Sequence, residues 1–367
     1  PEVFARDNGG FDAIVGNPPF LGGTGISQAF GMPYFQYLVA QNKPAEHHCD
    51  LVAYFFRAGF RLARNQGVVG FIATNTIAQG DTREGGLAAL LASGGTISRA
   101  VKRLKWPGEA AVVVSVVHVV KGNFAGARTL DGRLVSHISA FLVEGAQNSS
   151  PVPLAGTPYF SLGSKIYGQG FLFDDRDAGA SPIRIMHQII EARPDLSERI
   201  RPYIGGEEIN TSPSHSPSRF AIYLSDIGSE QELADYQPIA EIVRERVLPE
   251  RLKLGNNPNN APLKKRWWAY QAHRPKLYQE IANSNLVLCN SQVSPHLAFA
   301  IAPAGAIFAH TLNVVPKARL SLLTALQSRP HEVWARFFAS SMKDDLRYTP
   351  SDCLETFPFP RSFENSA

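Results

Sequence analysis

The sequence Asn17-Pro18-Pro19-Phe20, which follows the apolar run Phe11–Val15, has the residue types needed to activate an amine. An exocyclic amine on an aromatic ring is a poor nucleophile, because its lone pair is delocalised into the ring. The Asn17 side-chain carbonyl and the Pro18 backbone carbonyl could accept hydrogen bonds from its two N–H groups. These bonds would pull the nitrogen toward tetrahedral geometry and free the lone pair. The prolines would keep both carbonyls aimed, since they fix φ and hold the preceding residues extended. Phe20 would stack on a base turned out of a duplex.

Other interpretations of this loop stay open from the residues alone. We assign Pro19 as its rigid hinge, but the same residues could form a turn that merely ends a strand. Asn-Pro-Pro-aromatic sequences also serve in methylation of a glutamine amide or of a base in RNA, which leaves the substrate open. Placement after a strand favours a ligand site, because open α/β sheets bind ligands at the carboxyl ends of their strands.

The first 146 residues predict the elements that must position this loop. Apolar runs typical of buried strands alternate with segments of helical spacing. This alternation predicts an α/β fold with a sheet covered by helices on both faces. The predicted strands are 11–15, 68–73, 97–101 and 111–120, and the predicted helices are 50–63 and 83–92.

Composition changes after residue 146. The stretch Gln147–Pro151 is typical of a linker, and short strand-like runs, scattered prolines and polar loops follow it. We expect a mixed α+β domain over 155–345 and a tail over 346–367 that packs against the rest. Helices in this half are predicted over 238–247, 320–327 and 331–341.

Composition and charge exclude several classes of protein. The 367 residues are 44% hydrophobic, which is typical of globular domains with real cores. No apolar run is long enough to predict a membrane span, which needs about 18 residues. The three cysteines lie far apart, so their spacing predicts neither a zinc site nor a disulfide framework and favours a reducing cytoplasm.

Positive charge is concentrated in the second half of the chain. The whole chain carries +4, but residues 244–276 hold nine lysines and arginines against two glutamates. Within them, Lys264-Lys265-Arg266-Trp267 mixes cations with an aromatic ring, as surfaces that contact DNA phosphates often do. The competing interpretation is a helix that buries Trp268 under a solvated basic face.

Several segments together resemble a known family. Residues 11–20 resemble motif IV of adenine-N6 DNA methyltransferases of the gamma order. Residues 50–56 and 67–75 are similar to motifs V and VI of that family, and Trp106-Pro107-Gly108 resembles motif VIII. Segments beyond the linker, 167–171, 266–268, 344–353 and 356–360, are similar to the MmeI-like group, in which the methyltransferase and a target-recognition domain share one chain.

The resemblance implies a function for the site. It implies a Rossmann-like methyltransferase sheet, present in part, that moves a methyl group from S-adenosylmethionine to N6 of a flipped adenine in duplex DNA. It places Trp106 beside that base, implies no metal, and implies a role in restriction-modification or phage defence, in some relatives with a nuclease in the same chain. The alternatives are a DNA-recognition module that transfers nothing and a methyltransferase acting on RNA or on protein glutamine.

One part of the family pattern is missing. The Gly-rich turn that binds the methyl donor lies upstream of motif IV in the family, and 16 residues precede Asn17 here. We therefore expect the C-terminal part of a longer protein. By itself this part should bind S-adenosylmethionine weakly or not at all, and should be inactive.

Overall fold

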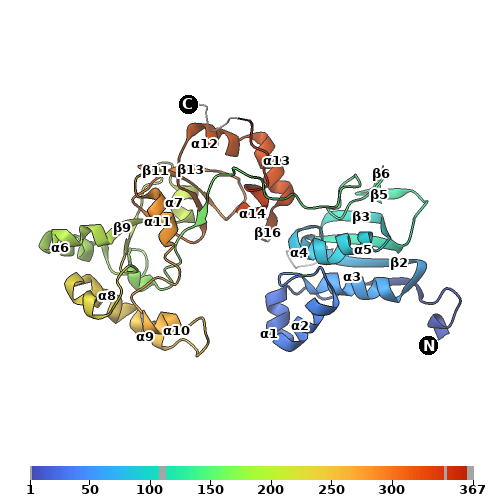
Figure 1. Ribbon diagram of the computed structural model, residues 1–367, viewed down its shortest axis with the longest axis horizontal. Coiled ribbons are helices and arrows are strands. Elements are labelled where there is room, and N and C mark those ends of the chain that lie inside the picture. The colour runs from blue at the N-terminus through green and yellow to red at the C-terminus, as the bar shows by residue number, and fades with distance from the viewer. Residues whose placement is uncertain (1, 107–112, 343–344, 362–367) are drawn as a thin grey trace. The chain divides into compact units, whose positions relative to one another are not determined.

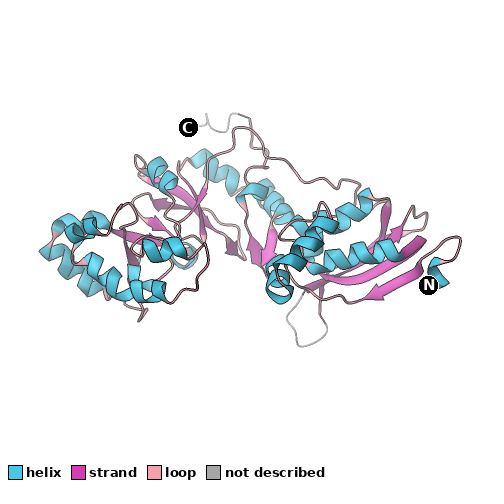
Figure 2. Cartoon of the chain, turned by 60° about the horizontal axis from the view of Figure 1, so that its bottom comes forward, coloured by secondary structure: helices cyan, strands magenta, loops and turns pink. Residues whose placement is uncertain are grey.

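The structure is a computed structural model that describes residues 2–106, 113–342 and 345–361. The chain forms two compact units, shown in Figures 1 and 2. Unit 1 comprises Pro1–Val152 and Arg336–Arg347, and unit 2 comprises Pro153–Ala335 and Tyr348–Ala367. Each unit has its own buried apolar cores.

Unit 1 is built on a six-stranded sheet in the order β1-β2-β4-β3-β5-β6. β2 is parallel to β1, whereas β4 is antiparallel to both β2 and β3. The strands β1, β2 and β3 therefore run in one direction and end at the same edge. The strand bounds are β1 Phe11–Gly16, β2 Ala63–Thr74, β3 Gly95–Lys105, β4 Val113–Lys121, β5 Arg128–Leu130 and β6 Arg133–Val135.

Helices cover one face of this sheet. α3 (Leu51–Leu62) buries Val52, Phe56 and Phe60 in a core that also contains Val69 of β2. The opposite face of the sheet is more open, because the Val15 side chain is 82% exposed. The other helices of this unit are α1 Gly23–Phe30, α2 Met32–Gln41, α4 Gly80–Arg83 and α5 Ala89–Ala92.

The helix predicted over 83–92 is interrupted. A π-helical turn spans Glu84–Ala88, between α4 and α5. A Cβ on Gly85 would lie 2.8 Å from the Ala45 Cβ, and one on Gly86 would lie 3.0 Å from the Ala53 Cβ. The glycines therefore allow the backbone to approach its neighbours closely, and the spacing of apolar residues did not predict the widened turn.

The segment after residue 335 joins unit 1 although its neighbours in sequence belong to unit 2. The helix predicted over 331–341 is α13 (Arg329–Phe338), which ends earlier because β16 (Ser340–Met342) pairs antiparallel with β17 (Asp345–Arg347). The Phe337 and Phe338 rings lie 5.1 and 5.8 Å from the Phe141 ring of unit 1. These ring contacts hold the segment in unit 1, whereas the sequence placed it in the second domain.

Unit 2 is a mixed α+β structure. It contains two four-stranded sheets, in the orders β14-β9-β10-β8 and β13-β11-β15-β7. Their strands are β7 Ser161–Leu162, β8 Leu172–Phe173, β9 Ile200–Ile204, β10 Arg219–Ile222, β11 Leu286–Ser291, β13 Ala300–Pro303, β14 Ile307–Phe308 and β15 Leu312–Val315; the short β12 is Val293–Ser294. The helices are α6 Ile183–Ala192, α7 Gly206–Thr211, α8 Ile239–Arg246, α9 Leu248–Leu252, α10 Ala261–Lys265, α11 Pro275–Ile281, α12 Leu320–Leu326 and α14 Pro350–Cys353.

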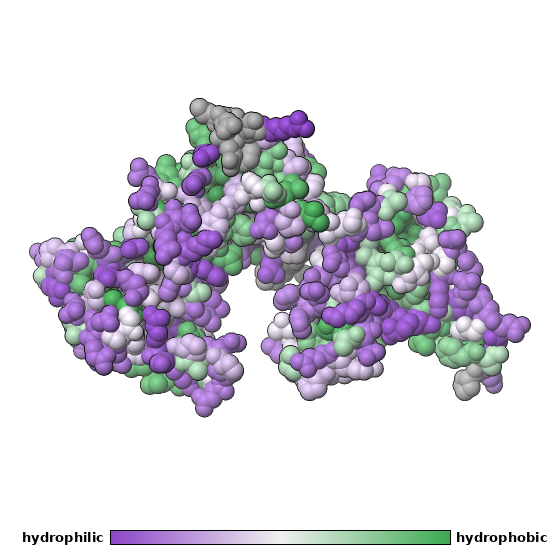
Figure 3. Space-filling model, in the orientation of Figure 1, coloured by the Kyte–Doolittle hydropathy of each residue, from purple (hydrophilic) through white to green (hydrophobic). Residues whose placement is uncertain are grey.

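No helix among the described residues is both long and apolar enough to span a membrane. On the face shown in Figure 3, hydrophilic residues predominate over the helical part of unit 2 at the left of the picture.

Candidate active site at the strand ends of unit 1

The two predicted positions Asn17 and Trp106 meet Asn75 at one edge of the unit 1 sheet. Asn17 follows β1, Asn75 follows β2 and Trp106 follows β3, at the carboxyl ends of strands that run in one direction. The ends of β2 and β3 are level with each other, since Thr74 and Leu104 both pair with Val114 of β4. The topology alone therefore assembles these residues at the edge where open α/β sheets bind ligands.

The Asn17 side chain is free to meet a ligand. It is exposed, and within the described part of the chain it makes no hydrogen bond. Pro18 is buried, which fixes the loop, and its carbonyl has no partner among the described backbone groups. The two acceptors that the sequence assigns to the target amine are thus both unoccupied.

Phe20 is held more firmly than a simple stacking ring would be. Its side chain is half-buried and packs against the unit 1 core, as does that of Leu21. Stacking on a base could therefore use only the exposed part of the ring. Pro19, by contrast, is exposed between the buried Pro18 and the half-buried Phe20.

Asp50 anchors the end of this loop. Its Oδ1 accepts hydrogen bonds from the Leu21 N–H at 3.3 Å and from the Val52 N–H at 3.0 Å, so one carboxylate pins the loop and caps α3. The Asp50 N–H in turn donates to the Thr82 hydroxyl at 3.0 Å. Burial raises the pKa of the Asp50 carboxyl, and the hydrogen bonds from Val52 and Leu21 oppose that shift. The sequence did not single out Asp50, because Leu21 is 29 residues away.

Asn75 is oriented by the strand beside it. The Ser115 hydroxyl of β4 donates to the Asn75 Oδ1 at 3.2 Å, which leaves the amide N–H groups of Asn75 directed elsewhere. The hydroxyls of Thr74 and Thr76 lie 2.6 Å apart. The Thr74 side chain does not cap the 3-10 turn that follows it.

Trp106 lies at the same edge but not beside Asn17. Three steps between neighbouring strands separate β1 from β3, and at ~4.8 Å per step this is about 14 Å. The Trp106 side chain is half-buried. At that separation it could border the far side of an opening that also admits a base, but it could not touch Asn17. The Pro107-Gly108 part of its predicted motif falls outside the described residues.

No cysteine in the chain is suited to act as a nucleophile. Cys49, Cys289 and Cys353 are all buried, and burial raises the pKa of each thiol to about 12. In the described residues no cluster of histidine, cysteine and acidic side chains could hold a metal ion. The loop carbonyls at Asn17 and Pro18 therefore remain the strongest candidates for chemistry.

The residues of the predicted basic cluster of unit 2 differ in how far they are exposed. Lys265 is exposed and Lys264 is half-buried, with its Nζ donating to the Asn256 Oδ1 at 2.9 Å. The Arg266 Nη2 donates to the carbonyls of Ser225 and Ile227, so this guanidinium stabilises the fold.

The prediction that Trp267 contacts DNA does not fit its position. Its ring is 3% exposed, and it packs in the unit 2 core edge-to-face against Trp268 at 5.5 Å. An indole in that position has no free face for a base. The alternative interpretation therefore fits better, but with both indoles buried rather than Trp268 alone.

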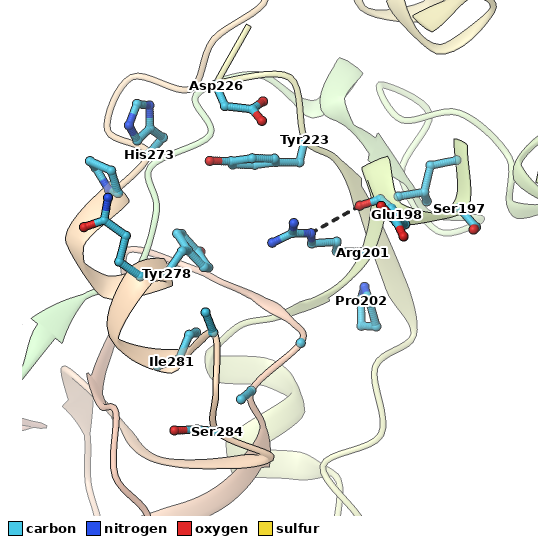
Figure 4. Close-up of a pocket in the computed structure, with 16 residues that line it drawn as sticks. Ser197, Glu198, Arg201, Pro202, Tyr223, Asp226, His273, Tyr278, Ile281 and Ser284 are labelled. Carbon is cyan, nitrogen blue, oxygen red and sulfur yellow. Dashed lines mark hydrogen bonds between the residues drawn. The ribbon is translucent and has the colours of Figure 1, made fainter. Parts of the chain in front are cut away.

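Unit 2 also contains a cavity of about 830 Å³ that the sequence did not indicate. Figure 4 shows Tyr223 and Arg201 facing each other in it, with the guanidinium 4.9 Å from the ring centroid. The Arg201 Nε donates to the Glu198 carbonyl, and Asp226 on the same wall is ion-paired with Arg199 at 2.7 Å. Charges of both signs line this cavity, so it does not favour an anionic ligand.

The fold and the Asn-Pro-Pro-Phe loop, with its exposed Asn17 side chain, define a methyltransferase-type α/β unit joined to a second, α+β unit. More particularly, the chain belongs to the MmeI family. Residues 147–361 match the family model for the MmeI target recognition domain, and residues 1–101 match that for the Eco57I restriction-modification methylase.

Two known proteins are similar along almost the whole chain. DNA methyltransferase A of Bacillus subtilis (strain 168) is 24% identical over 367 residues, which is 95% of this chain and 39% of that protein. The Type IIL restriction-modification enzyme MmeI, solved in complex with DNA, superposes with a TM-score of 0.75 at 20% identity, covering 95% of this chain and 46% of MmeI. The predicted fold class is confirmed by this likeness, and the chain spans less than half of either relative.

Proposed function

We propose that the protein containing this chain is a site-specific DNA methyltransferase that transfers a methyl group from S-adenosylmethionine to N6 of adenine. The observation that carries the proposal is the exposed, unpartnered Asn17 side chain beside the free Pro18 carbonyl at a strand end. Membership of the MmeI family and the DNA methyltransferase relative support DNA as the substrate.

The chain's own residues would activate the amine. The Asn17 side-chain carbonyl and the Pro18 backbone carbonyl accept hydrogen bonds from the two N–H groups of the flipped adenine, which localises the nitrogen lone pair for attack. Asp50 keeps these acceptors in place through Leu21. S-adenosylmethionine, when bound, would supply an electrophilic methyl carbon attached to a positively charged sulfur. The nitrogen–carbon bond forms as the carbon–sulfur bond breaks, and the amine proton leaves to solvent.

The described residues fit only part of a donor site. Gly16 and Asn17 would face the donor at the end of β1, where the neighbouring Val15 side chain is 82% exposed. The Gly-rich stretch Gly22-Gly23-Thr24-Gly25 leads into α1 and follows the Asn17–Phe20 loop, whereas in the family the Gly-rich donor-binding turn lies upstream of that loop. We infer that most contacts to S-adenosylmethionine come from parts of the protein outside this sequence.

Unit 2 would read the DNA sequence. Its match to a target recognition domain supports duplex DNA as the partner, with backbone contacts that position the protein and base contacts that select the site. A restriction-modification role and a nuclease in the same full-length protein are part of this proposal, because the solved relative MmeI is a restriction-modification enzyme.

The test uses the full-length protein with labelled S-adenosylmethionine and duplex DNA. Label should appear as N6-methyladenine, and Asn17→Ala should lower kcat by about 100-fold or more while DNA affinity changes little. Asn123→Ala, which also removes an exposed asparagine from unit 1, is the matched control and should keep full activity.

Other results would refute the assignment. Label found in RNA or protein alone would exclude DNA as the substrate. DNA binding by the full-length protein without transfer of label would favour a recognition module that lacks enzymatic activity.

A further inference from the structure

Three segments of unit 2 that are distant in sequence are joined side by side at its surface. The Ser164 N–H donates to the Phe308 carbonyl at 2.7 Å, and the Lys165 N–H donates to the Ala272 carbonyl at 2.9 Å. The buried Ser164 hydroxyl also donates to the His273 carbonyl at 3.1 Å. The backbone near residues 164–167, 272–274 and 308–310 therefore forms one rigid support.

This support displays positive charge that the chain does not neutralise. Lys165 and Arg274 are half-buried and His310 is exposed. Within the described part of the chain, no carboxylate lies within 4.0 Å of any of these groups. Burial lowers the pKa of His310, and the nearby charges of Lys165 and Arg274 lower it further, so the positive charge of this cluster comes from Lys165 and Arg274.

Six arginines of unit 2 differ from this cluster in having carboxylate partners. These pairs are Arg176 with Glu207, Arg193 with Asp195, Arg199 with Asp226, Arg219 with Glu208, Arg244 with Glu230 and Arg329 with Glu332. Cations that lie close together without a carboxylate repel one another, and a bound anion would offset this repulsion.

Tyr167 adds a hydrogen-bond donor to this cluster. Its side chain is 45% exposed, and the buried Arg251 and the Lys165 Nζ lie 5.1 and 5.7 Å from its ring centroid. The two cations restrain the ring, so the hydroxyl has a defined direction. Tyr167 and Arg274 also have left-handed backbones, with φ of 51° and 55°. Such conformations cost about 1 kcal/mol or more and tend to persist at binding sites.

The cluster adjoins the predicted DNA-binding segment. Arg266 and Arg274 line the same cavity of about 400 Å³. Arg274 therefore lies between the predicted DNA-binding segment and the positions of Lys165 and His310, and a surface of this length fits an extended anion better than a small one.

We propose that Lys165, Tyr167, Arg274 and His310 form a surface of unit 2 that grips the sugar-phosphate backbone of duplex DNA. This inference rests on the proposed function and names residues that contact phosphates rather than bases. Phosphate contacts are independent of sequence, so the surface can be tested before the recognition site is known.

The test measures binding of the full-length protein to fluorescein-labelled duplex DNA of arbitrary sequence over a series of KCl concentrations. Each lost phosphate contact should reduce the slope of log K against log salt by about 0.9. For Lys165→Gln/Arg274→Gln the magnitude of the slope should fall by about 1.8. The ratio of the wild-type association constant to that of this variant should therefore fall about 12-fold between about 50 and about 200 mM salt.

Matched variants distinguish the loss of phosphate contacts at this surface from a change in net charge and from misfolding. Lys317→Gln/Arg329→Gln removes the same charge from exposed positions of unit 2 and should keep the wild-type slope. Lys165→Arg/Arg274→Lys retains the charge and should also keep it. An unchanged slope for Lys165→Gln/Arg274→Gln would overturn the inference but not the methyltransferase assignment. A loss of slope in the charge-retaining variant would overturn it too. Failure of the wild-type protein to bind duplex DNA would overturn both.

Discussion

The hydrogen bond from Leu21 to Asp50, which holds the candidate catalytic loop Asn17–Phe20, leads to a prediction that separates stability from activity. Asp50→Ala removes the cap of α3 and the hydrogen bond to Leu21. The cap contributes about 1 kcal/mol and the second hydrogen bond about 1 kcal/mol, so the free energy of unfolding should fall by about 2 kcal/mol. Asp50→Ser keeps a cap but is too short to reach Leu21 as well, and should lose about 1 kcal/mol. Asp50→Asn keeps both contacts and should be close to wild type in both properties.

The activity of these variants should follow the contact to Leu21 rather than stability. A shift of about 1 Å in a reacting group can cost about 100-fold in rate, so Asp50→Ser should lower kcat of the full-length protein between about 10- and 100-fold. Urea unfolding of this chain and methyl transfer to duplex DNA provide the two measurements. Asp131→Ala is the control, since Asp131 also accepts a backbone N–H, that of Lys102, but at the β5–β6 turn; it should lose stability and keep kcat. If Asp50→Ser methylates DNA at the wild-type rate, the hydrogen bond between Asp50 and Leu21 does not position the loop.

Three further predictions test the site and the core. Ser115→Ala removes the hydrogen bond that orients Asn75, and should lower kcat several-fold for a stability loss of about 1 kcal/mol; equal kcat would exclude Asn75 from the site. Trp267→Ala should lower the free energy of unfolding by about 3 to 5 kcal/mol, because the ring is buried, whereas Lys265→Ala should leave it unchanged. A Trp267→Ala variant that is as stable as wild type but binds DNA more weakly would show instead that this ring contacts DNA. The His331 imidazole is buried between the Leu326 carbonyl and the Tyr348 hydroxyl, and burial lowers its pKa. As the pH falls, the unfolded chain therefore takes up a proton at His331 before the folded chain does. The free energy of unfolding should fall below about pH 6.5, by at most about 1.4 kcal/mol per pH unit for this group. Urea unfolding at several pH values should show a smaller fall in His331→Gln than in wild type, and an equal fall would contradict this assignment.

Much of unit 1 could be predicted from the sequence, because its signals are local. The run Phe11–Val15 forms β1 with one further residue, and the segment of helical spacing that begins at Asp50 forms α3 with that residue as its cap. The residue types at Asn17 and Pro18 predict acceptors, and the structure leaves both groups free. That the strand ends come together at one edge follows from the alternation of strands and helices.

The remaining features depend on contacts between distant residues. Composition around Lys264 indicates basic character but cannot show that Trp267 faces inward, since either of two adjacent indoles could occupy the core. Lys165, Arg274 and His310 lie too far apart in sequence to be recognised as one cluster. The pairing of β16 with β17, and the contacts of Phe337 and Phe338 with Phe141, likewise have no local signal.

The return of residues 336–347 to unit 1 limits how recognition units can be exchanged between members of this family. A transplant cut after Ala335 would separate His331 from Tyr348, which share a hydrogen bond of 3.1 Å, and would remove the Tyr348 carbonyl that accepts from the Asn313 amide. A compatible graft must carry both 153–335 and the segment from 348 onward, while the host supplies the hairpin between them. Unit 2 is therefore interrupted in sequence by a segment of unit 1, and hybrids joined at a single crossover should fold poorly.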